Sequence, residues 1–269
     1  MYSLYGGIEQ LSIKLKEELQ KLPNVQVCLD SPATRLEFGE KVKVHVKVQS
    51  KPSVLEVDHV VCAIPSKALQ KLIEQPIEEL TFNPSVDVAV VNFAFDKKVL
   101  PYAAFGYLVP RSVSDSIALG VVFDSCSFPL ATPNHEILTV MMGGHQFPSR
   151  IGDSATITND ELLFKARQVL GQQLKIQDVP VAHQVTLQHQ CIPQYLVNHP
   201  RRMQKLHRTI ENQFKSKLSV TGASYTGVAI NDCILYSGKL ADQLLSKGIL
   251  GSDPYPSPVT GLELYETLS

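Results

Sequence analysis

The stretch that decides the fold reads VTGASYTGVAINDCI and spans residues 220–234. An apolar segment at 218–220 leads into Gly222 and Gly227, and a helical pattern follows over about 230–247. Glycines let a backbone turn sharply and let another molecule approach its N–H groups closely. The helix that follows has unpaired N–H donors and the positive end of its dipole at this point. The stretch therefore predicts a strand–turn–helix unit able to bind an anion, most often a phosphate.

The turn alone does not identify a ligand. Its spacing is G-x-x-x-x-G, which differs from the G-x-G-x-x-G dinucleotide fingerprint, and it does not continue as the G-K-[ST] of a P-loop. A strand–glycine–helix turn without any ligand is also a common connection. On these residues alone, both interpretations stay open.

Composition restricts the class of protein. The 269 residues are 44% apolar and 19% charged, which is typical of a soluble globular protein of one or two domains. The 25 basic and 26 acidic residues nearly balance, so we expect no nucleic-acid partner. The sequence holds no run of eighteen apolar residues, so no membrane span is predicted, and the first residues show no targeting pattern.

The five cysteines are widely spread and form no C-x-x-C pair, which disfavours a disulfide framework or a zinc site. Cys62, Cys191 and Cys233 stand in apolar runs, so we expect them to be buried. The eight histidines show no metal-ligand spacing, and no metal site is predicted. Asp124 and Tyr225 are candidate acid–base groups, but the sequence supplies no partner for either, so no catalytic side chain is assigned.

Hydrophobic spacing predicts helices in some segments of the chain and strands in others. Helices are expected over 8–22, from a Ser66 cap, over about 158–170 behind a Thr158–Glu161 capping box, over 203–214 and over 230–247. Strands are expected at 25–29, at 42–48 and, buried on both faces, at 57–64; the segment 82–142 has several strands separated by turns, which favours an antiparallel arrangement. The basic run 199–208 is expected to be a solvated helix face.

Several motifs share one resemblance. GASYTGVAINDCI at 222–234 resembles the C-terminal flavin-binding motif of the porphyrinogen-oxidising branch of the FAD-dependent amine oxidase-like family. SLYGGIEQL at 3–11 and VDHVVCAIP at 57–65 are similar to two further motifs of that family. FGYLVP, VVFDS, VMMGG and CIPQY follow in the order and at roughly the spacing that the family shows. The resemblance covers about residues 3–246.

The resemblance implies an α+β / α/β fold that forms part of a two-domain FAD-dependent oxidoreductase. Residues 1–75 and 215–248 are expected to belong to an incomplete dinucleotide-binding domain, and 76–214 to an antiparallel-sheet substrate domain. Residues 249–269 are expected to be an irregular tail. The N-terminal Rossmann unit with its G-x-G-x-x-G motif is missing from these residues. We therefore expect this chain alone not to hold FAD tightly.

The resemblance also implies site residues. The cofactor-binding positions are Ala33, Ala223, Val228, Ala229 and Ile230. Ala33 stands where the family has a valine whose backbone meets the adenine ring, and a main-chain contact tolerates the change. The substrate-binding positions are Phe105, Gly106, Leu108 and Met141, whose aromatic, aliphatic and thioether groups suit an apolar macrocycle.

The implied activity is FAD-dependent oxidation of a porphyrinogen by molecular oxygen in haem biosynthesis. The resemblance further implies the mitochondrial inner membrane with peripheral membrane association, a homodimer and contact with the next haem-pathway enzyme. Two alternatives remain: a non-enzymatic truncated remnant unable to hold FAD, and another flavin oxidase acting on amines or carotenoids. Since the flavin carries the chemistry in this family, no catalytic triad or carboxylate pair is required.

Overall fold

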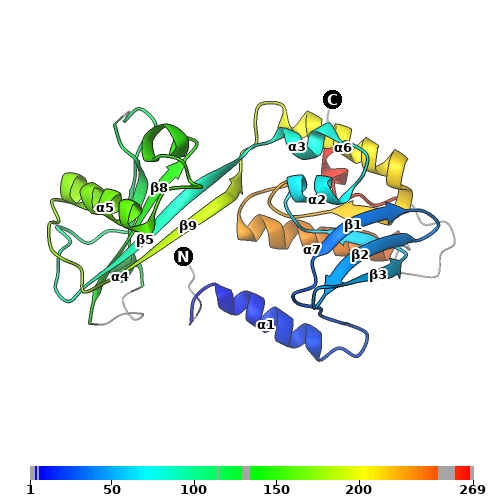
Figure 1. Cartoon of the computed structure of the whole chain (residues 1–269), viewed down its shortest axis with the longest axis horizontal. Helices are drawn as coiled ribbons and strands as arrows, with labels where there is room; N and C mark the ends of the chain where they lie inside the picture. The colour runs from blue at the N-terminus through cyan, green and yellow to red at the C-terminus, as the bar shows by residue number, and fades with distance from the viewer. Residues whose placement is uncertain (1–3, 5, 114, 129–133, 248–257, 267–269) are drawn as a thin grey trace. The chain divides into compact units, whose positions relative to one another are not determined.

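The described residues fold into two compact units. The computed structural model describes residues 4, 6–113, 115–128, 134–247 and 258–266 (Figure 1). One unit, here the sheet unit, comprises Met1–Val27 and Ser85–Cys191. The other, here the turn unit, comprises Cys28–Pro84 and Ile192–Ser269. No helix of the described residues is long and apolar enough to cross a bilayer.

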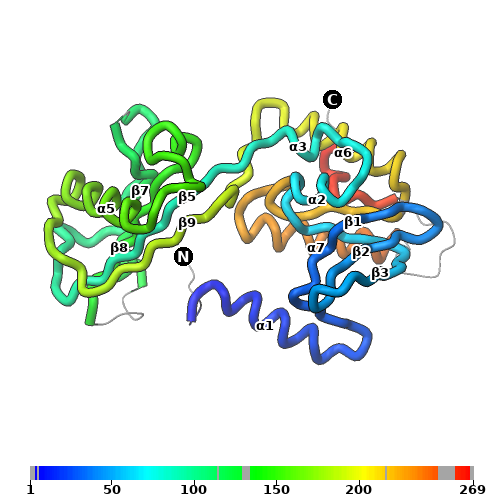
Figure 2. Tube along the Cα trace, in the orientation of Figure 1, coloured from blue at the N-terminus to red at the C-terminus, as the bar shows by residue number. Residues whose placement is uncertain are grey.

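The sheet unit is built on a five-stranded sheet of order β6-β7-β8-β5-β9. Its strands are β5 (Ser85–Phe95), β6 (Gly106–Leu108), β7 (Ala118–Phe123), β8 (Glu136–Gly144) and β9 (Ala182–Pro193). The pairs β6–β7, β7–β8 and β5–β8 are antiparallel, which confirms the arrangement predicted for 82–142. β5 pairs with β8 rather than with β6, and Figure 2 shows the long traces of β5 and β9 running side by side.

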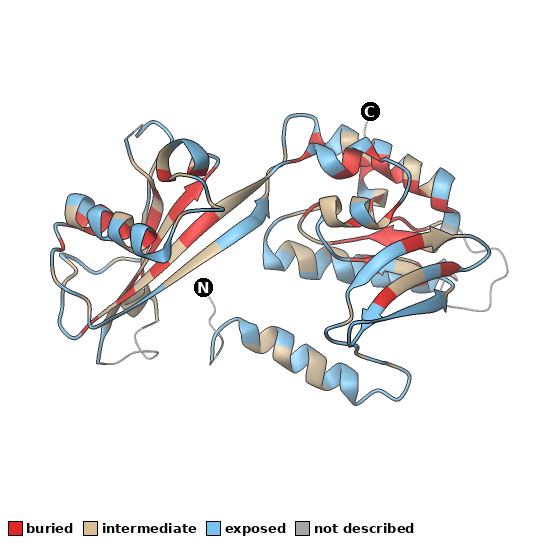
Figure 3. Ribbon diagram, in the orientation of Figure 1, coloured by how far each residue is buried: buried red, intermediate tan, exposed pale blue. Residues whose placement is uncertain are grey.

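One helix covers one face of this sheet. Helix α5 (Asn159–Val169) begins at the predicted capping box, in which the Thr158 N–H donates to Glu161 Oε2 at 2.8 Å. Its Leu162, Ala166 and Val169 are buried among strand residues of the sheet. The unit also contains α1 (Glu9–Gln20), α4 (Asp124–Ser127) and two π-helical turns, η1 (Phe147–Ile151) and η2 (Leu170–Leu174). Helix α1 occurs as predicted, but it buries none of its residues (Figure 3).

The turn unit combines two small sheets with helices. The strands β1 (Ala33–Phe38), β2 (Val42–Val48) and β3 (Lys51–Val57) form an antiparallel sheet, and β4 (Val60–Cys62) pairs in parallel with β10 (Leu218–Val220). The helices are α2 (Ser66–Leu72), α3 (Glu78–Phe82), α6 (His199–Phe214) and α7 (Ile230–Ser246), with 3₁₀ turns η3 (Lys215–Lys217) and η4 (Glu263–Tyr265). This mixture of helices and parallel and antiparallel strands agrees with the predicted fold class.

Helix α6 supplies much of the core of the turn unit. Its predicted apolar face is buried as expected and consists of Met203, Leu206, Ile210 and Phe214. Full burial of such side chains stabilises a fold by about 1.5–3 kcal/mol each. The basic run on this helix is only partly a solvated face, because His199 and His207 are buried while its Arg201, Lys205 and Arg208 are exposed.

Some local predictions were wrong. Residues 25–29 form no strand, and the short β4 leaves Val61 46% exposed, so it is not buried on both faces. Strands β1 and β3 were not predicted, since neither alternates clearly between apolar and polar residues. Helix α2 begins after Pro65 without a side-chain cap, and Ser66 instead donates its N–H to the Ser224 hydroxyl at 3.1 Å.

Cys62 is buried as expected, but Cys191 is exposed because it lies on β9 at the edge of the sheet, and Cys233 is half-buried. All five cysteines are free thiols. Burial raises the pKa of the Cys62 thiol.

The observed units differ from the predicted domain boundaries. Residues 76–84 and 192–214 belong to the turn unit, and 1–27 to the sheet unit. Part of the predicted irregular tail is ordered: the Val220 N–H donates to the Thr260 carbonyl at 2.8 Å, and Val259 and Leu262 are buried. The Thr260 carbonyl of the tail accepts a hydrogen bond from a β10 backbone N–H that is not paired with β4. Buried backbone groups need such partners. Which unit serves cofactor and which serves substrate stays a prediction.

Candidate functional site

The glycine turn of residues 221–229 follows β10. It starts at the edge of the two-stranded sheet where the parallel strands β10 and β4 both end. The Thr221 N–H donates to the Cys62 carbonyl at 3.1 Å, which ties the start of the turn to the end of β4. Gly222 then adopts a φ of 102°, a region that favours glycine. Ligands of open α/β sheets bind outside the carboxyl ends of the strands, so the turn stands where such a site is expected.

Two side chains hold the carbonyl of Tyr225. His199 donates from Nε2 at 2.8 Å, and the Tyr265 hydroxyl donates at 3.0 Å. A planar trans peptide directs its N–H opposite to its carbonyl, so the N–H of Thr226 points away from both donors. The aromatic groups therefore fix which side of the turn presents amide donors.

A third side chain acts on the preceding part of the turn. The Tyr195 hydroxyl donates to the Ala223 carbonyl at 2.6 Å, and the Gly227 N–H also interacts with this hydroxyl. By the same peptide geometry, the Ser224 N–H points away from Tyr195. The Tyr195 ring stacks on His199 with the ring centroids 3.8 Å apart. Burial raises the pKa of Tyr195, so the phenol stays protonated and able to donate.

The protonation state of His199 follows from its partners. Because Nε2 faces a carbonyl, it carries the proton, and Nδ1 then accepts from Asn83 Nδ2 at 2.9 Å. Burial lowers the pKa of this imidazole, and the positive charge of Arg202 lowers it further. The neutral ring thus bridges the loop before β5 and the glycine turn.

The other side of the turn offers unused donors. Ala229, the residue before α7, has no side-chain cap bond. The first N–H groups of a helix have no intrahelical acceptor. Thr226 Oγ1 is buried and has no hydrogen-bond partner among the described residues. An uncapped helix start beside an orphaned hydroxyl suits the polar part of a nucleotide.

The predicted cofactor residues are placed unevenly. Four of them lie on the turn or at the start of α7: Ala223, Val228, Ala229 and Ile230. Val228 and Ile230 are 48% and 51% exposed and can contact a ligand. Ala33 is exposed at the start of β1, and no hydrogen bond of the described residues joins it to the turn. The structure thus brings four of the five together.

Three of the four predicted substrate residues share one face of the five-stranded sheet. Strand pairing sets Leu108 opposite Gly120, and Gly120 opposite Met141. Gly106 lies two residues before Leu108 and therefore on the same face. This face is opposite to the one that α5 covers, and on it Leu108 is 78% exposed and Met141 half-buried.

Phe105 is placed differently. It precedes β6, is 55% exposed, and its carbonyl accepts the Phe123 N–H at 2.9 Å. No strand pairing assigns its side chain to the face that carries the other three. Its role as a substrate residue stays a prediction.

A polar row on the same face was not predicted. Asn92 Nδ2 donates to Thr139 Oγ1 at 2.7 Å, and this hydroxyl donates to Asp124 Oδ2 at 2.7 Å. Asp124 therefore has the partner that the sequence did not show. Burial raises the pKa of its carboxyl group. The available signal was a polar residue in or directly after three apolar strands: Asn92 in β5, Thr139 in β8 and Asp124 directly after β7.

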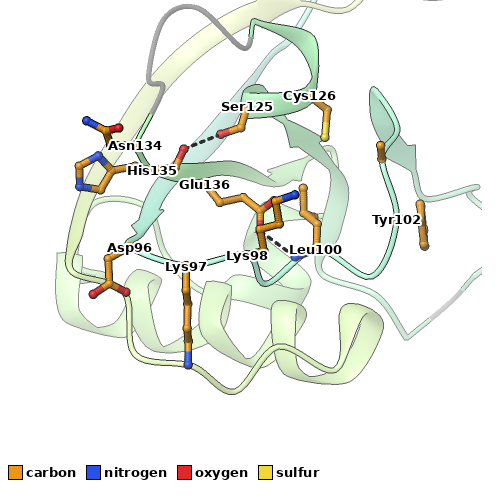
Figure 4. A pocket seen from close by; sticks show the side chains of 11 residues that line it. Asp96, Lys97, Lys98, Leu100, Tyr102, Ser125, Cys126, Asn134, His135 and Glu136 are labelled. Atoms are coloured by element: carbon orange, nitrogen blue, oxygen red, sulfur yellow. Dashed lines mark hydrogen bonds between the residues drawn. The ribbon is translucent and has the colours of Figure 1, made fainter.

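Another cavity lies elsewhere in the sheet unit. Its volume is about 490 Å³, and its lining includes Lys97, Ser125 and Glu136 (Figure 4). These polar groups have structural partners: Glu136 accepts the backbone N–H of Leu100 at 2.8 Å, and Ser125 donates to the His135 carbonyl at 3.1 Å. None of the predicted site residues lines it. Within the described ranges, no group of His, Cys, Asp or Glu could hold a metal.

Comparison with known proteins identifies the family. The model of the family described as flavin containing amine oxidoreductase matches residues 1–245. The chain belongs to the flavin-containing amine oxidoreductase family. The resemblance of the sequence motifs to this family is thereby confirmed, and the family uses a flavin cofactor. Contact of the glycine turn with the flavin nucleotide stays a prediction.

Curated members of this family include close relatives of the chain. Protoporphyrinogen oxidase of Schizosaccharomyces pombe is 36% identical over 91% of this chain, and that of Homo sapiens is 33% identical over 94%. These matches cover 49% and 52% of the relatives. The chain thus spans about half the length of the curated relatives it matches.

Solved structures show the same fold. A crystal structure of a protein from Exiguobacterium sp. 255-15 matches this chain with a TM-score of 0.77 at 20% identity. The match covers 90% of this chain and 51% of that protein. Reduced UDP-galactopyranose mutase matches 93% of this chain with a TM-score of 0.67 at 13% identity, and 53% of that chain is covered. The predicted fold, part of a flavin-dependent oxidoreductase, is confirmed.

Proposed function

We propose that the protein containing this chain is a protoporphyrinogen oxidase, which oxidises protoporphyrinogen IX to protoporphyrin IX with FAD as cofactor and oxygen as acceptor. The observation that carries the proposal is the half-exposed sheet face with Gly106, Leu108 and Met141. A porphyrinogen is a broad apolar macrocycle, and a flat aliphatic surface with a thioether suits its faces. The relatives of more than 30% identity noted above carry the name of this enzyme.

The residues of the chain divide the work. The turn presents the N–H groups of Ser224 and Thr226 and the uncapped start of α7 to the flavin nucleotide, while His199 and Tyr195 keep the turn in shape. The sheet face binds the macrocycle and excludes water from it. The bound flavin supplies the hydride acceptor, so these residues need only bind and orient.

The alternatives predict different behaviour. A non-enzymatic remnant neither retains FAD nor supports turnover in any context. An oxidase of amines needs a narrower site than the half-exposed sheet face that carries Gly106, Leu108 and Met141. The chain alone, about half the length of its relatives, is expected to lose FAD on gel filtration.

A chimera tests the function. The N-terminal part of the Schizosaccharomyces pombe relative, up to the start of the matched region, is joined to this chain. We expect the purified chimera to retain FAD and to form porphyrin from protoporphyrinogen faster than the spontaneous oxidation measured without protein. An FAD-loaded chimera that oxidises putrescine but not protoporphyrinogen contradicts the proposal. A chimera without FAD favours the remnant.

Location and assembly belong to the same proposal. We place the complete protein at the mitochondrial inner membrane, as a peripheral protein and a homodimer that contacts the next haem-pathway enzyme. Support for these points comes from the resemblance of the sequence motifs alone. Fractionation of cells that produce a tagged full-length protein checks the first of them, and a soluble cytosolic pool would contradict it.

A further inference from the structure

The carboxylate of Asp124 is held on the open sheet face by a chain of hydrogen bonds. The Asn92 amide donates to Thr139, and Thr139 uses its single hydroxyl proton to donate to Asp124 Oδ2, both at 2.7 Å. The direction of each bond is fixed, since an amide nitrogen only donates and a carboxylate oxygen accepts. Asn92 and Thr139 thus orient the carboxylate rather than compete with it.

This carboxylate keeps unused acceptor capacity. An ionised carboxylate has about four lone-pair sites on two oxygens. Besides Thr139, its interactions include its own backbone N–H. No cationic side chain of the described residues forms an ion pair with Asp124. A half-buried carboxylate that is oriented, has free acceptor sites and forms no ion pair is arranged to receive donors from a ligand.

The position of the acceptor matches that of the predicted substrate residues. Thr139 and Met141 are separated by two positions on β8 and so lie on one face, about 7 Å apart. Thr139 lies opposite Val122, which in turn lies opposite Gly106. The polar row and the apolar row are therefore neighbouring rows of one surface, and a macrocycle that covers one row also meets the other.

The chemistry of the proposed substrate identifies the donors. A porphyrinogen carries four pyrrole N–H groups, and its saturated bridging carbons let the rings tilt so that these groups point out of the mean plane. In the planar porphyrin, the remaining inner N–H groups point to the ring centre. An acceptor above the ring therefore meets donors in the reduced macrocycle and none in the oxidised one.

We propose that Asp124 binds the pyrrole N–H groups of the reduced macrocycle and thereby favours substrate over product. This inference rests on the proposed function and adds a specificity residue to it. Thr139 is a positioning residue, because it acts through Asp124. Oxidation removes the hydrogen-bond donors that Asp124 binds, which weakens the binding of the product and assists its release.

Binding of the two macrocycles by the purified 269-residue chain tests the proposal. Protoporphyrinogen is kept reduced under argon, and protoporphyrin carries the same peripheral substituents. Equilibrium dialysis gives the dissociation constant of each, with the porphyrinogen oxidised after separation and quantified by fluorescence. The variants are Asp124→Asn, Thr139→Val and, as matched control, Asp96→Asn at an exposed carboxylate of the same unit. Circular dichroism and the melting temperature verify that each variant folds.

We expect Asp124→Asn to raise the dissociation constant of porphyrinogen about tenfold, the effect of one hydrogen bond to a charged group. The constant for porphyrin changes less than about twofold, and Asp96→Asn leaves both unchanged. Thr139→Val shows a smaller loss in the same direction, because the carboxylate remains but is no longer oriented.

Three results overturn the proposal. If Asp124→Asn weakens the binding of both macrocycles equally, the carboxylate does not bind the pyrrole N–H groups. Unchanged binding of both shows that it does not contact the ligand, while the sheet face and the proposed function stand. If the unsubstituted chain binds neither macrocycle, the sheet face is not a substrate site, and the proposed function loses the observation that carries it.

Discussion

The rings of Tyr195 and His199 stack with their centroids 3.8 Å apart and their planes within 7° of parallel. Each ring donates a hydrogen bond to a carbonyl of the glycine turn, Tyr195 to Ala223 and His199 to Tyr225. The conformation of the glycine turn is therefore set by a pair of rings on a separate segment, just before and at the start of α6. Stability measurements on this pair can test how the turn is held.

Replacement of Tyr195 by Phe removes one hydrogen bond and keeps the stacked ring. We expect the free energy of unfolding to fall by about 1 kcal/mol, as is usual for a lost intramolecular hydrogen bond. Urea unfolding followed by circular dichroism measures the change. The matched control is Tyr102→Phe, which removes a hydroxyl from a 56% exposed ring and should leave stability unchanged. Equal effects of the two substitutions would contradict the bracing role.

Acidification should destabilise the turn through His199. Burial lowers the pKa of His199 below its usual 6.5 in the folded chain, so the unfolded chain binds the proton first. Stability is then lost as the pH falls from about 6.5 to the lower folded value, and the loss is complete below it. We expect the urea midpoint of His199→Gln to depend less on pH between 8 and 5 than that of the unsubstituted chain.

The exposed His183 provides the control for this pH effect. His183→Gln should preserve the pH dependence of the urea midpoint, since its ring is in contact with water in both states. A pH profile of His199→Gln identical to that of the unsubstituted chain would show that His199 is not the responsible group.

Replacement by Phe should change the stability of the chain in opposite directions at Tyr225 and Tyr265. The Tyr225 hydroxyl is fully buried and has no partner among the described residues, so Tyr225→Phe relieves an unsatisfied donor and should raise stability by up to about 1 kcal/mol. Tyr265→Phe deletes the donor to the Tyr225 carbonyl and should lower stability by about 1 kcal/mol. Thermal unfolding of both variants decides this, and a stability loss in Tyr225→Phe would reveal a partner of its hydroxyl.

Two glycine substitutions test the packing of the C-terminal segment on β10. A Cβ at Gly261 would lie 2.0 Å from the Val220 carbonyl oxygen, and its φ is 82°. We expect Gly261→Ala to cost more than about 2 kcal/mol, since both a clash and backbone strain arise. Gly238→Ala in the exposed middle of α7 has open space and should instead add about 1 kcal/mol. A harmless Gly261→Ala would mean that the segment is not held against β10.

The sequence by itself determined the elements whose pattern is local. Helix α5 follows from a capping box within four residues, and α6 from apolar residues at helical spacing. The glycine turn and the family follow from the stretch 220–234, because glycines, strand and helix start adjoin in the chain. Three of the predicted substrate residues proved to share a face because strand alternation fixes the side on which each residue lies.

Only the tertiary structure decided what depends on contacts distant in sequence. Asp124, Thr139 and Asn92 meet because β5 pairs with β8 rather than with β6, an order that no local pattern specifies. Likewise, the donors that hold the glycine turn come from Tyr195, His199 and Tyr265, up to 40 residues from the carbonyls they reach. Such choices depend on which surfaces bury most area and satisfy most backbone groups together, and that is a property of the whole fold.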